Sequence, residues 1–348
     1  MSPYVLATLI STLGLGTMIA LSSSHWLLAW MCLEINTLAI IPLMAQHPHP
    51  RAVESATKYF IAQAAGAATI LFAALTNSWV SGSWHIPEMW HPLPCTMCIL
   101  GLALKMGIAP LHSWMPEVMQ GLSLKTALIL ATWQKLAPFC ILLQVPPSNP
   151  ALLMALGITS ILVGGWGGFN QTQVRKVLAY SSIAHLGWMV LILQFSPSLA
   201  LLSLFIYFII TTATFLLLDT SKATNINLLA TAWSKTPALY AIAPLVLLSL
   251  GGLPPLTGFI PKWLILKELT EESLFVAATF AALGALISLF FYLRLAYAVI
   301  LIILPHTIIA IAPWRIKRPK VYLLGAICVI LSLVLLPFTP LLTALFSW

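Results

Sequence analysis

The chain has 348 residues, of which 60% are hydrophobic and only 7% are charged, and it carries a formal net charge of +8. Soluble domains hold about 25% charged residues. The apolar residues here follow a helical period rather than the alternation of a membrane β-barrel. The composition therefore excludes a soluble protein and predicts an all-α integral membrane protein.

Eleven membrane-spanning helices are predicted in chain order, within one domain over residues 1–348. The first apolar run begins at once, without a basic leader or a small-residue cleavage site, so we expect a first helix and not a targeting signal. The fourth and ninth segments exceed the length of one straight span, about 17–25 residues. The segments cover 3–22, 25–44, 56–77, 94–120, 122–144, 150–170, 175–195, 198–218, 237–268, 275–303 and 321–345.

The two long segments contain matching helix breaks, offset by 145 residues. Interrupted helices in corresponding halves of a transporter mark its binding site. We therefore predict a first repeat over about 1–170, a second over about 171–303 and a separate C-terminal helix over about 321–345, although chance similarity in a chain rich in Leu, Pro and Gly is an alternative. The matching positions are Gly107, Pro110 and Pro116 in the first copy and Gly252, Pro255 and Pro261 in the second.

Basic residues gather in alternate connections between the predicted helices. The even-numbered connections hold 11 of the 16 Lys and Arg residues, whereas the odd-numbered ones hold almost none. Because Lys and Arg concentrate on the inner side of a membrane, this pattern predicts an inside N-terminus and an outside C-terminus. The residues concerned are Arg51, Lys58, Lys125, Arg175, Lys176, Lys222, Lys235, Arg315, Lys317, Arg318 and Lys320.

Among the other charged residues inside predicted helices, Lys267 and Arg294 lie near helix ends and can reach water. The candidates for a function inside the membrane are Glu34, Lys105, Lys135 and Lys262. A lysine at mid-membrane costs about 2.5–3.5 kcal/mol even on the mildest scale. One interpretation is a buried ion pair between Glu34 and one lysine, which leaves the other lysines unpaired. The other is a proton relay, because burial disfavours the charged form of a lysine and a nearby carboxylate favours it. A carboxylate that moves then switches the protonation state, and we favour this second interpretation.

Two histidines and two serines are candidate water-wire residues. His112 lies in the first break, and His185 lies in the seventh segment beside Ser181 and Ser182. Imidazole accepts and donates protons near neutral pH, but polar contacts between helices explain these residues equally well. No histidine pair suits haem ligation, and the chain has no Gly-rich nucleotide loop or metal-ligand cluster. We therefore expect no metal and no redox cofactor in this chain.

These motifs closely resemble those of the antiporter-like membrane subunits of NADH:ubiquinone oxidoreductase, respiratory complex I, in their mitochondrially encoded subunit 2 branch. The resemblance covers essentially the whole chain, and the family is related to subunits of multi-subunit sodium/proton antiporters. Its most specific parts are WMCLEINTLAIIP around Glu34, LALKMGIAPLHSWMPEV around Lys105, WQKLAP around Lys135, AYSSIAHLGWM around His185 and GGLPPLTGFIPKW around Lys262.

The resemblance implies a fold of two inverted five-helix repeats, each with one broken helix, in an eleven-helix form that lacks three helices of bacterial relatives. It implies that Glu34 pairs with Lys105, that Lys135 bridges the halves and that Lys262 faces the outlet. The expected activity is proton translocation by the H+-translocating NADH:ubiquinone reductase, coupled to electron transfer from NADH to ubiquinone. NADH, flavin, iron–sulfur clusters and ubiquinone are expected to bind elsewhere in the complex.

The resemblance also implies partners and a location. The expected partners are the other membrane-arm subunits, including the neighbouring antiporter-like subunit and the small four-L subunit, together with phospholipids such as cardiolipin, and no nucleic acid. The expected location is the mitochondrial inner membrane, with the N-terminus in the matrix and the C-terminus in the intermembrane space. Two other functions stay open at this stage: a self-standing cation/proton antiporter and a structural membrane-arm spacer without an active pathway.

Overall fold

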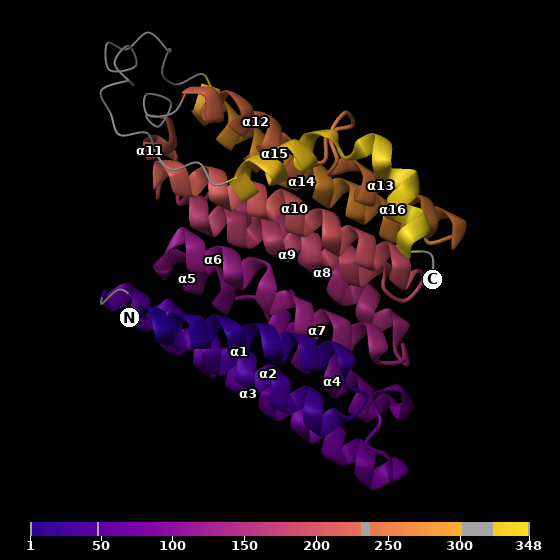
Figure 1. The fold of residues 1–348 in the computed structure, drawn as a ribbon. Helices are drawn as coiled ribbons and strands as arrows, with labels where there is room; N and C mark the ends of the chain where they lie inside the picture. Colours follow the sequence, from indigo (N-terminus) through magenta and orange to yellow (C-terminus); the bar gives the residue numbers. More distant parts are fainter. Residues whose placement is uncertain (1, 47–48, 231–236, 301–322, 347–348) are drawn as a thin grey trace. The chain divides into compact units, whose positions relative to one another are not determined.

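The computed structural model describes residues 2–46, 49–230, 237–300 and 323–346. Within these ranges the chain is helical, and the extended pairing consists of two isolated β-bridges (Figure 1). The chain divides into two compact units, Met1–Leu156 and Gly157–Trp348.

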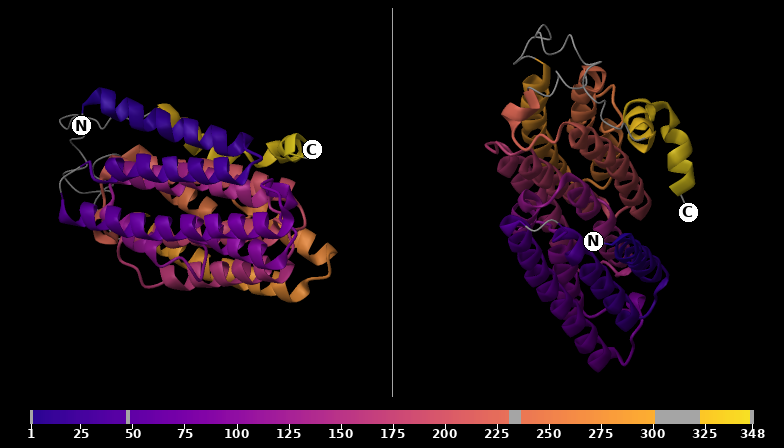
Figure 2. Two further views of the ribbon diagram at one scale, coloured as in Figure 1. Left: turned by 90° about the horizontal axis from the view of Figure 1, so that it is seen from below. Right: turned by 60° about the vertical axis from the view of Figure 1, so that its left-hand side comes forward.

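The first unit contains seven helices, one short 3₁₀ turn and the start of an eighth helix. In Figures 1 and 2, α1, α2 and α3 lie side by side along their lengths. The elements are α1 (Pro3–Ser22), α2 (Trp26–Met44), α3 (Pro50–Ser81), η1 (Ile86–Glu88), α4 (Pro92–Met106), α5 (Trp114–Gly121), α6 (Leu124–Ala131), α7 (Trp133–Gln144) and the start of α8 (Pro150–Gly168).

The second unit contains the rest of α8 and the helices that follow it. Residues 231–236 and 301–322 lie outside the described part of this unit. The elements are α9 (Val174–Ile192), α10 (Pro197–Ser221), α11 (Ile226–Ala230), α12 (Pro237–Gly251), α13 (Phe259–Glu271), α14 (Phe275–Ile300), α15 (Leu323–Val334), η4 (Leu336–Phe338) and α16 (Thr339–Phe346).

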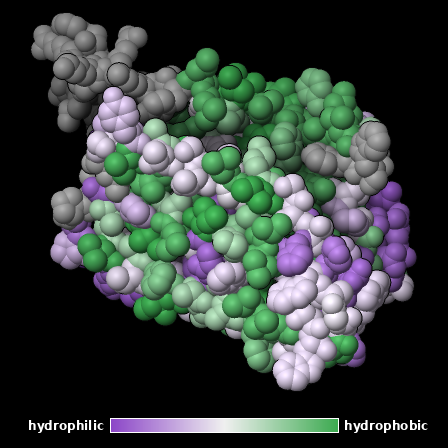
Figure 3. Space-filling model, turned by 60° about the horizontal axis from the view of Figure 1, so that its bottom comes forward, coloured by the Kyte–Doolittle hydropathy of each residue, from purple (hydrophilic) through white to green (hydrophobic). Residues whose placement is uncertain are grey.

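Seven spans in the described residues are long and apolar enough to cross a membrane. An eighth is reached if α15 and the bent helix after it form one span. The all-α membrane fold is therefore confirmed, but the exact count of eleven is not, partly because both predicted long segments consist of two shorter helices. Apolar side chains cover much of the face drawn in Figure 3, as expected of a surface in contact with lipid.

Three predicted segments differ from the structure. Helix α3 begins at Pro50 rather than residue 56, because His49 caps it through Nδ1 and proline suits the first helical position. The segment 122–144 is interrupted at Thr132, between α6 and α7. The C-terminal segment is bent by 72° near Pro337 in η4, where proline lacks the backbone donor that a straight helix needs.

The two helix breaks have the same backbone geometry. Helix α4 ends at Met106 and α12 at Gly251, and the next residues, Gly107 and Gly252, have φ of +77° and +80°. Each glycine amide donates back to carbonyls of the preceding turn, as in a glycine C-cap. The helices resume at Trp114 and Phe259, so both ends of both breaks are offset by the same 145 residues.

The two isolated β-bridges also occupy corresponding positions in the two units. In the first unit His25, before α2, pairs with His85, between α3 and α4. In the second unit Gln173, before α9, pairs with Asn225, between α10 and α12. In each unit the bridge therefore joins the connection before one long helix to the connection after the next long helix, ahead of the broken helix. This adds backbone evidence for an internal repeat to the evidence of the breaks.

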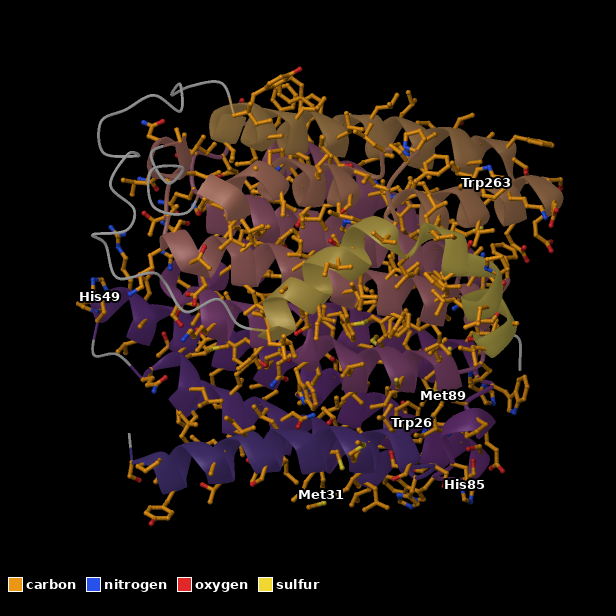
Figure 4. All side chains as sticks on the ribbon, turned by 45° about the horizontal axis from the view of Figure 1, so that its top comes forward. Trp26, Met31, His49, His85, Met89 and Trp263 are labelled. Atoms are coloured by element: carbon orange, nitrogen blue, oxygen red, sulfur yellow. The ribbon has the colours of Figure 1, made fainter. Side chains whose placement is uncertain are left out.

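Basic residues gather at one end of the first unit. A side chain on Gly121 would meet the carbonyl oxygen of Arg51 at 2.5 Å, and Lys58 Nζ lies 2.8 Å from Glu117 Oε2. The α2–α3 and α5–α6 connections are therefore neighbours. Figure 4 shows His49 at this end and His85, with its bridge, at the other.

The second unit has its bridge at its basic end. The bridge joins the α8–α9 and α10–α11 connections; Lys222 lies in the second of these, and Arg175 and Lys176 lie in the first turn of α9. Arg294 Nη1 donates to the carbonyl of Phe169 at the same end, at 2.9 Å. The predicted basic residues Lys235, Arg315, Lys317, Arg318 and Lys320 lie outside the described residues.

Replacing Gly107 with Ala should destabilise the protein more than the same change at Gly82. Both glycines have left-handed φ, which costs a residue with a Cβ about 1–2 kcal/mol. A Cβ at Gly82 meets nothing within 4 Å, whereas one at Gly107 would lie 3.1 Å from Met115 Sδ and 3.3 Å from Trp114 Cζ2. Thermal unfolding of the purified protein measures the difference, and equal losses would contradict close packing at the break.

Candidate functional site

The first break exposes backbone carbonyls that side chains then cap. The last carbonyls of a helix have no partner within the helix. Trp114 Nε1 donates to the carbonyl of Leu104 at 3.0 Å, and Gln63 Nε2 donates to the carbonyl of Lys105 at 3.2 Å. The break is therefore stabilised by an indole from α5 and an amide from α3, without use of the Lys105 ammonium group.

Lys105 faces Glu34 across the α2–α4 contact. The side chain of Lys105 is 2% exposed and that of Glu34 is 25% exposed, and Lys105 Nζ lies 3.9 Å from Glu34 Oε1. Thr37 Oγ1 donates to Glu34 Oε2 at 3.2 Å, whereas Lys105 Nζ has no hydrogen-bond partner within the described residues. The two groups form an ion pair that is longer than a hydrogen bond.

Lys135 lines the same small cavity as Lys105. Lys135 is 2% exposed, and the cavity has a volume of about 10 Å³. A cavity needs about 10–15 Å³ to admit the centre of one water molecule, so this one is at that limit. Its polar lining, besides the two lysines, consists of Asn36, Thr37, Tyr59, Gln63, Trp114 and Gln134.

The second break is capped by a lysine. Lys262, in the first turn of α13, is 8% exposed, and its Nζ donates to the carbonyl of Gly251 at 2.8 Å. Gly251 is the last residue of α12, where the helix dipole favours a cation. Lys262 is thus buried but hydrogen-bonded. The ion-pair interpretation of the sequence predicts a buried lysine without a partner at this position instead.

Lys262 also lines a cavity in the second unit. This cavity has a volume of about 20 Å³, enough for one water molecule, and His185, Ser203 and Tyr207 contribute to its wall. The rings of His185 and Tyr207 are 5.4 Å apart, and Ser182 is a hydrogen-bond partner of Tyr207. His185 and Lys262 therefore lie on one cavity that can take water.

His112, Ser181 and Ser182 are not in the lining of either cavity, although Ser182 is a hydrogen-bond partner of Tyr207, which lines the second. His112 is half-buried, and its Nδ1 lies 3.3 Å from the carbonyl oxygen of Pro110 in the break. Ser181 and Ser182 donate to the carbonyls of Leu178 and Ala179 in their own helix, each at 2.7 Å. The described ranges contain no group of three or more His, Cys, Asp or Glu residues that suits a metal ion.

The search for charged residues in the sequence missed the amides of the first cavity. Asn36, Gln63 and Gln134 lie inside apolar helices, and Gln134 Nε2 donates to the carbonyl of Asn36 at 3.2 Å. A search for amides within apolar segments finds all three. It does not show that they meet, because their contacts join residues far apart in the chain.

Residues 23–288 match the family described as NADH:quinone oxidoreductase/Mrp antiporter, TM. Residues 289–343 match the family described as NADH dehydrogenase subunit 2 C-terminus. The chain belongs to the NADH:quinone oxidoreductase/Mrp antiporter family. Proteins named NADH-ubiquinone oxidoreductase chain 2 are 62% identical in Salmo salar, over 348 residues, and 61% identical in Tetraodon nigroviridis, over 347 residues. Each alignment covers 100% of both chains.

Two solved structures have the same fold as this chain. A chain of respiratory complex I from Thermus thermophilus with bound aureothin aligns with a TM-score of 0.83 and 29% identity, over 98% of this chain and 80% of that chain. A chain of the Mrp complex from Dietzia sp. aligns with a TM-score of 0.82 and 15% identity, over 96% and 75%. The second likeness is one of fold alone.

A double-mutant cycle should reveal strong coupling between Glu34 and Lys105. Glu34→Gln and Lys105→Met, alone and combined, should give a coupling free energy of about 1–3 kcal/mol in thermal unfolding, because the lysine is buried and the carboxylate is only 25% exposed. The exposed pair of Lys267 and Glu271, 3.5 Å apart in one helix, is the control and should give about 0.5 kcal/mol or less. Coupling no larger than in the control would mean that Glu34 and Lys105 do not act as a pair.

Proposed function

We propose that this chain is a proton-translocating membrane-arm subunit of respiratory complex I, the H+-translocating NADH:ubiquinone oxidoreductase. Full-length relatives more than 60% identical are named as chain 2 of that enzyme, and a chain of a respiratory complex I has the same fold. Membership in an antiporter family supports proton transport rather than electron transfer as the work of this subunit.

The observation that carries the proposal is the arrangement of Glu34, Lys105 and Lys135. A carboxylate and a lysine lie 3.9 Å apart, and a second buried lysine lines the same cavity as the first. Three ionisable groups this close together inside a membrane protein are costly. An ion pair between Glu34 and Lys105 alone does not require a second buried lysine. A relay does, because a proton that leaves one amine requires another acceptor.

The mechanism follows from the geometry of the ion pair. Movement of Glu34 relative to Lys105 changes the proton affinity of the lysine, because the carboxylate favours the charged form. Lys105 then exchanges a proton with Lys135 through a water molecule in their shared cavity, which the amide side chains orient. The energy comes from ubiquinone reduction elsewhere in the complex. NADH, flavin, iron–sulfur clusters and ubiquinone belong to other subunits, so this chain binds none of them.

The second unit supplies the later steps of the proposed path. Lys135 is the residue that passes protons toward the second repeat. Lys262, which lines the same cavity as His185, delivers the protons to the outlet. Ser182 orients the Tyr207 hydroxyl beside this cavity through their hydrogen bond. His112 and Ser181 remain candidates for ordering water in the break and beside α9.

We also propose that the two repeats are inverted. In the first unit the β-bridge lies at the end away from the basic residues, and in the second unit it lies at the basic end. If both basic ends face the matrix, as the charge rule requires, equivalent bridges lie on opposite sides of the membrane. The N-terminus is then in the matrix and the C-terminus is in the intermembrane space of a mitochondrion.

The proposed partners are the neighbouring membrane-arm subunits, which include the next antiporter-like subunit and the small four-L subunit. Phospholipids such as cardiolipin are expected on the remaining apolar surface. Large apolar side chains stay exposed on several helices, for example Leu15 at 61%, Ile61 at 68% and Leu286 at 65%. Such surface requires lipid or a protein partner.

Lys105→Ala and Lys135→Ala should each reduce proton-coupled NADH oxidation by the assembled complex about tenfold or more, since a positioned proton-transfer group contributes about 10²–10⁴-fold. The rate of NADH oxidation by the assembled complex measures the loss, and the proton-to-electron stoichiometry in sealed vesicles shows whether the remaining turnover still moves protons. Lys267→Ala is the matched control, because Lys267 is exposed and pairs only with Glu271 among the ion pairs described.

The same experiment separates the alternatives. Normal stoichiometry in both lysine variants would defeat the relay and favour a structural spacer. A self-standing antiporter is supported instead if the chain purifies without an NADH-oxidising assembly and exchanges sodium for protons in vesicles.

A further inference from the structure

We infer that Gly66, in the middle of α3, is a positioning residue that sets where the Lys105 side chain lies relative to Glu34. The inference rests on the proposed function, in which the separation of these two charges controls the proton affinity of Lys105. Gly66 itself carries no polar side chain and does not exchange protons. Its role is to leave the space that the lysine occupies.

The evidence is the contact between Gly66 and the aliphatic part of Lys105. A Cβ on Gly66 would lie 2.9 Å from Lys105 Cγ, closer than real Cβ atoms approach, and 3.2 Å from the carbonyl oxygen of Gly101. The Lys105 side chain is 2% exposed and packs inside the protein. It therefore has little room to move aside, and an added methyl group has to displace it or separate the two helices.

Gln63 adds to the same effect from one turn away. Its amide donates to the carbonyl of Lys105 at 3.2 Å, so α3 fixes the lysine backbone with one residue and its side-chain stem with another. Residues three apart in a helix share a face. The Lys105 ammonium thus extends toward Glu34 from a base that α3 contacts at two points.

Close helix packing alone is the competing explanation for a glycine here, because small residues let membrane helices approach. Gly101 of α4 provides the comparison. It lies at the same crossing, but the three atoms nearest to a Cβ there belong to α3 and not to Lys105: Thr69 Oγ1 at 2.6 Å, Ile70 Cγ1 at 2.8 Å and the carbonyl oxygen of Gly66 at 3.2 Å. The two glycines therefore separate an effect on helix approach from an effect on the lysine.

Gly66→Ala should lower the proton-to-electron stoichiometry of the assembled complex and shift the pH profile of coupled turnover, whereas Gly101→Ala at equal assembly should change neither. A merely structural glycine does not move a pH profile. Comparable stoichiometry and pH profiles in the two variants would overturn the inference.

A double-mutant cycle tests the contact even where pumping is lost. If Gly66→Ala acts through the lysine stem, its loss of assembled complex and of thermal stability should be largely relieved in a Lys105→Ala background, because the Cγ atom is gone. Gly101→Ala should be equally harmful in both backgrounds. Additive effects of Gly66→Ala and Lys105→Ala, including failure of the double variant to assemble, would overturn the inference.

Failure of the inference and failure of the proposed function are distinguishable. Normal stoichiometry in Lys105→Ala defeats the relay, whatever the Gly66 variant does. Loss of stoichiometry in Lys105→Ala, together with additive Gly66 and Lys105 effects, leaves the relay intact and rejects the positioning role.

Discussion

The structure of the first unit depends on one electrostatic interaction, between Lys105 Nζ and Glu34 Oε1 at 3.9 Å. Opposite charges away from water attract far more strongly than at a surface, yet this separation is too long for a hydrogen bond. The surroundings preserve that intermediate state. Trp114 and Gln63 cap the carbonyls that the break exposes, so these carbonyls do not draw the ammonium group away from the carboxylate. The lysine is therefore attracted to Glu34 without being locked to it.

A broken helix makes this arrangement possible because it provides both a turn and unpaired backbone groups inside the membrane. Unpaired carbonyls are tolerated at membrane depth only where protein or water satisfies them. Gly107 ends α4 two residues after Lys105, which places the lysine in the last turn, where the helix dipole also favours a cation. The helix dipole at the break thus stabilises a charge that lipid would reject, and the carboxylate of Glu34 adds to that stabilisation.

The features predicted correctly from the sequence are those that depend on neighbouring residues. Glycine and proline in an apolar run mark a break wherever they occur, which is why both interrupted helices could be located. The capping groups depend instead on contacts across the fold: Gln63 lies 42 residues from Lys105, and Gln134 lies 98 residues from Asn36. The interruption at Thr132 has no glycine or proline at its centre, so no local signal predicts it.

The two breaks share a backbone but differ in the group that caps them, and this difference has mechanistic consequences. In the first unit neutral donors cap the carbonyls. In the second unit Lys262 Nζ donates to Gly251, the last residue of α12. A neutral amine at Lys262 retains hydrogens to donate but loses the charge that suits the helix end. Proton transfer at Lys262 therefore weakens the join between α12 and α13, whereas proton transfer at Lys105 leaves the caps of its own break in place. On the proposed path, the first break stays rigid while the lysine titrates, and the second break is the one whose backbone responds to the proton.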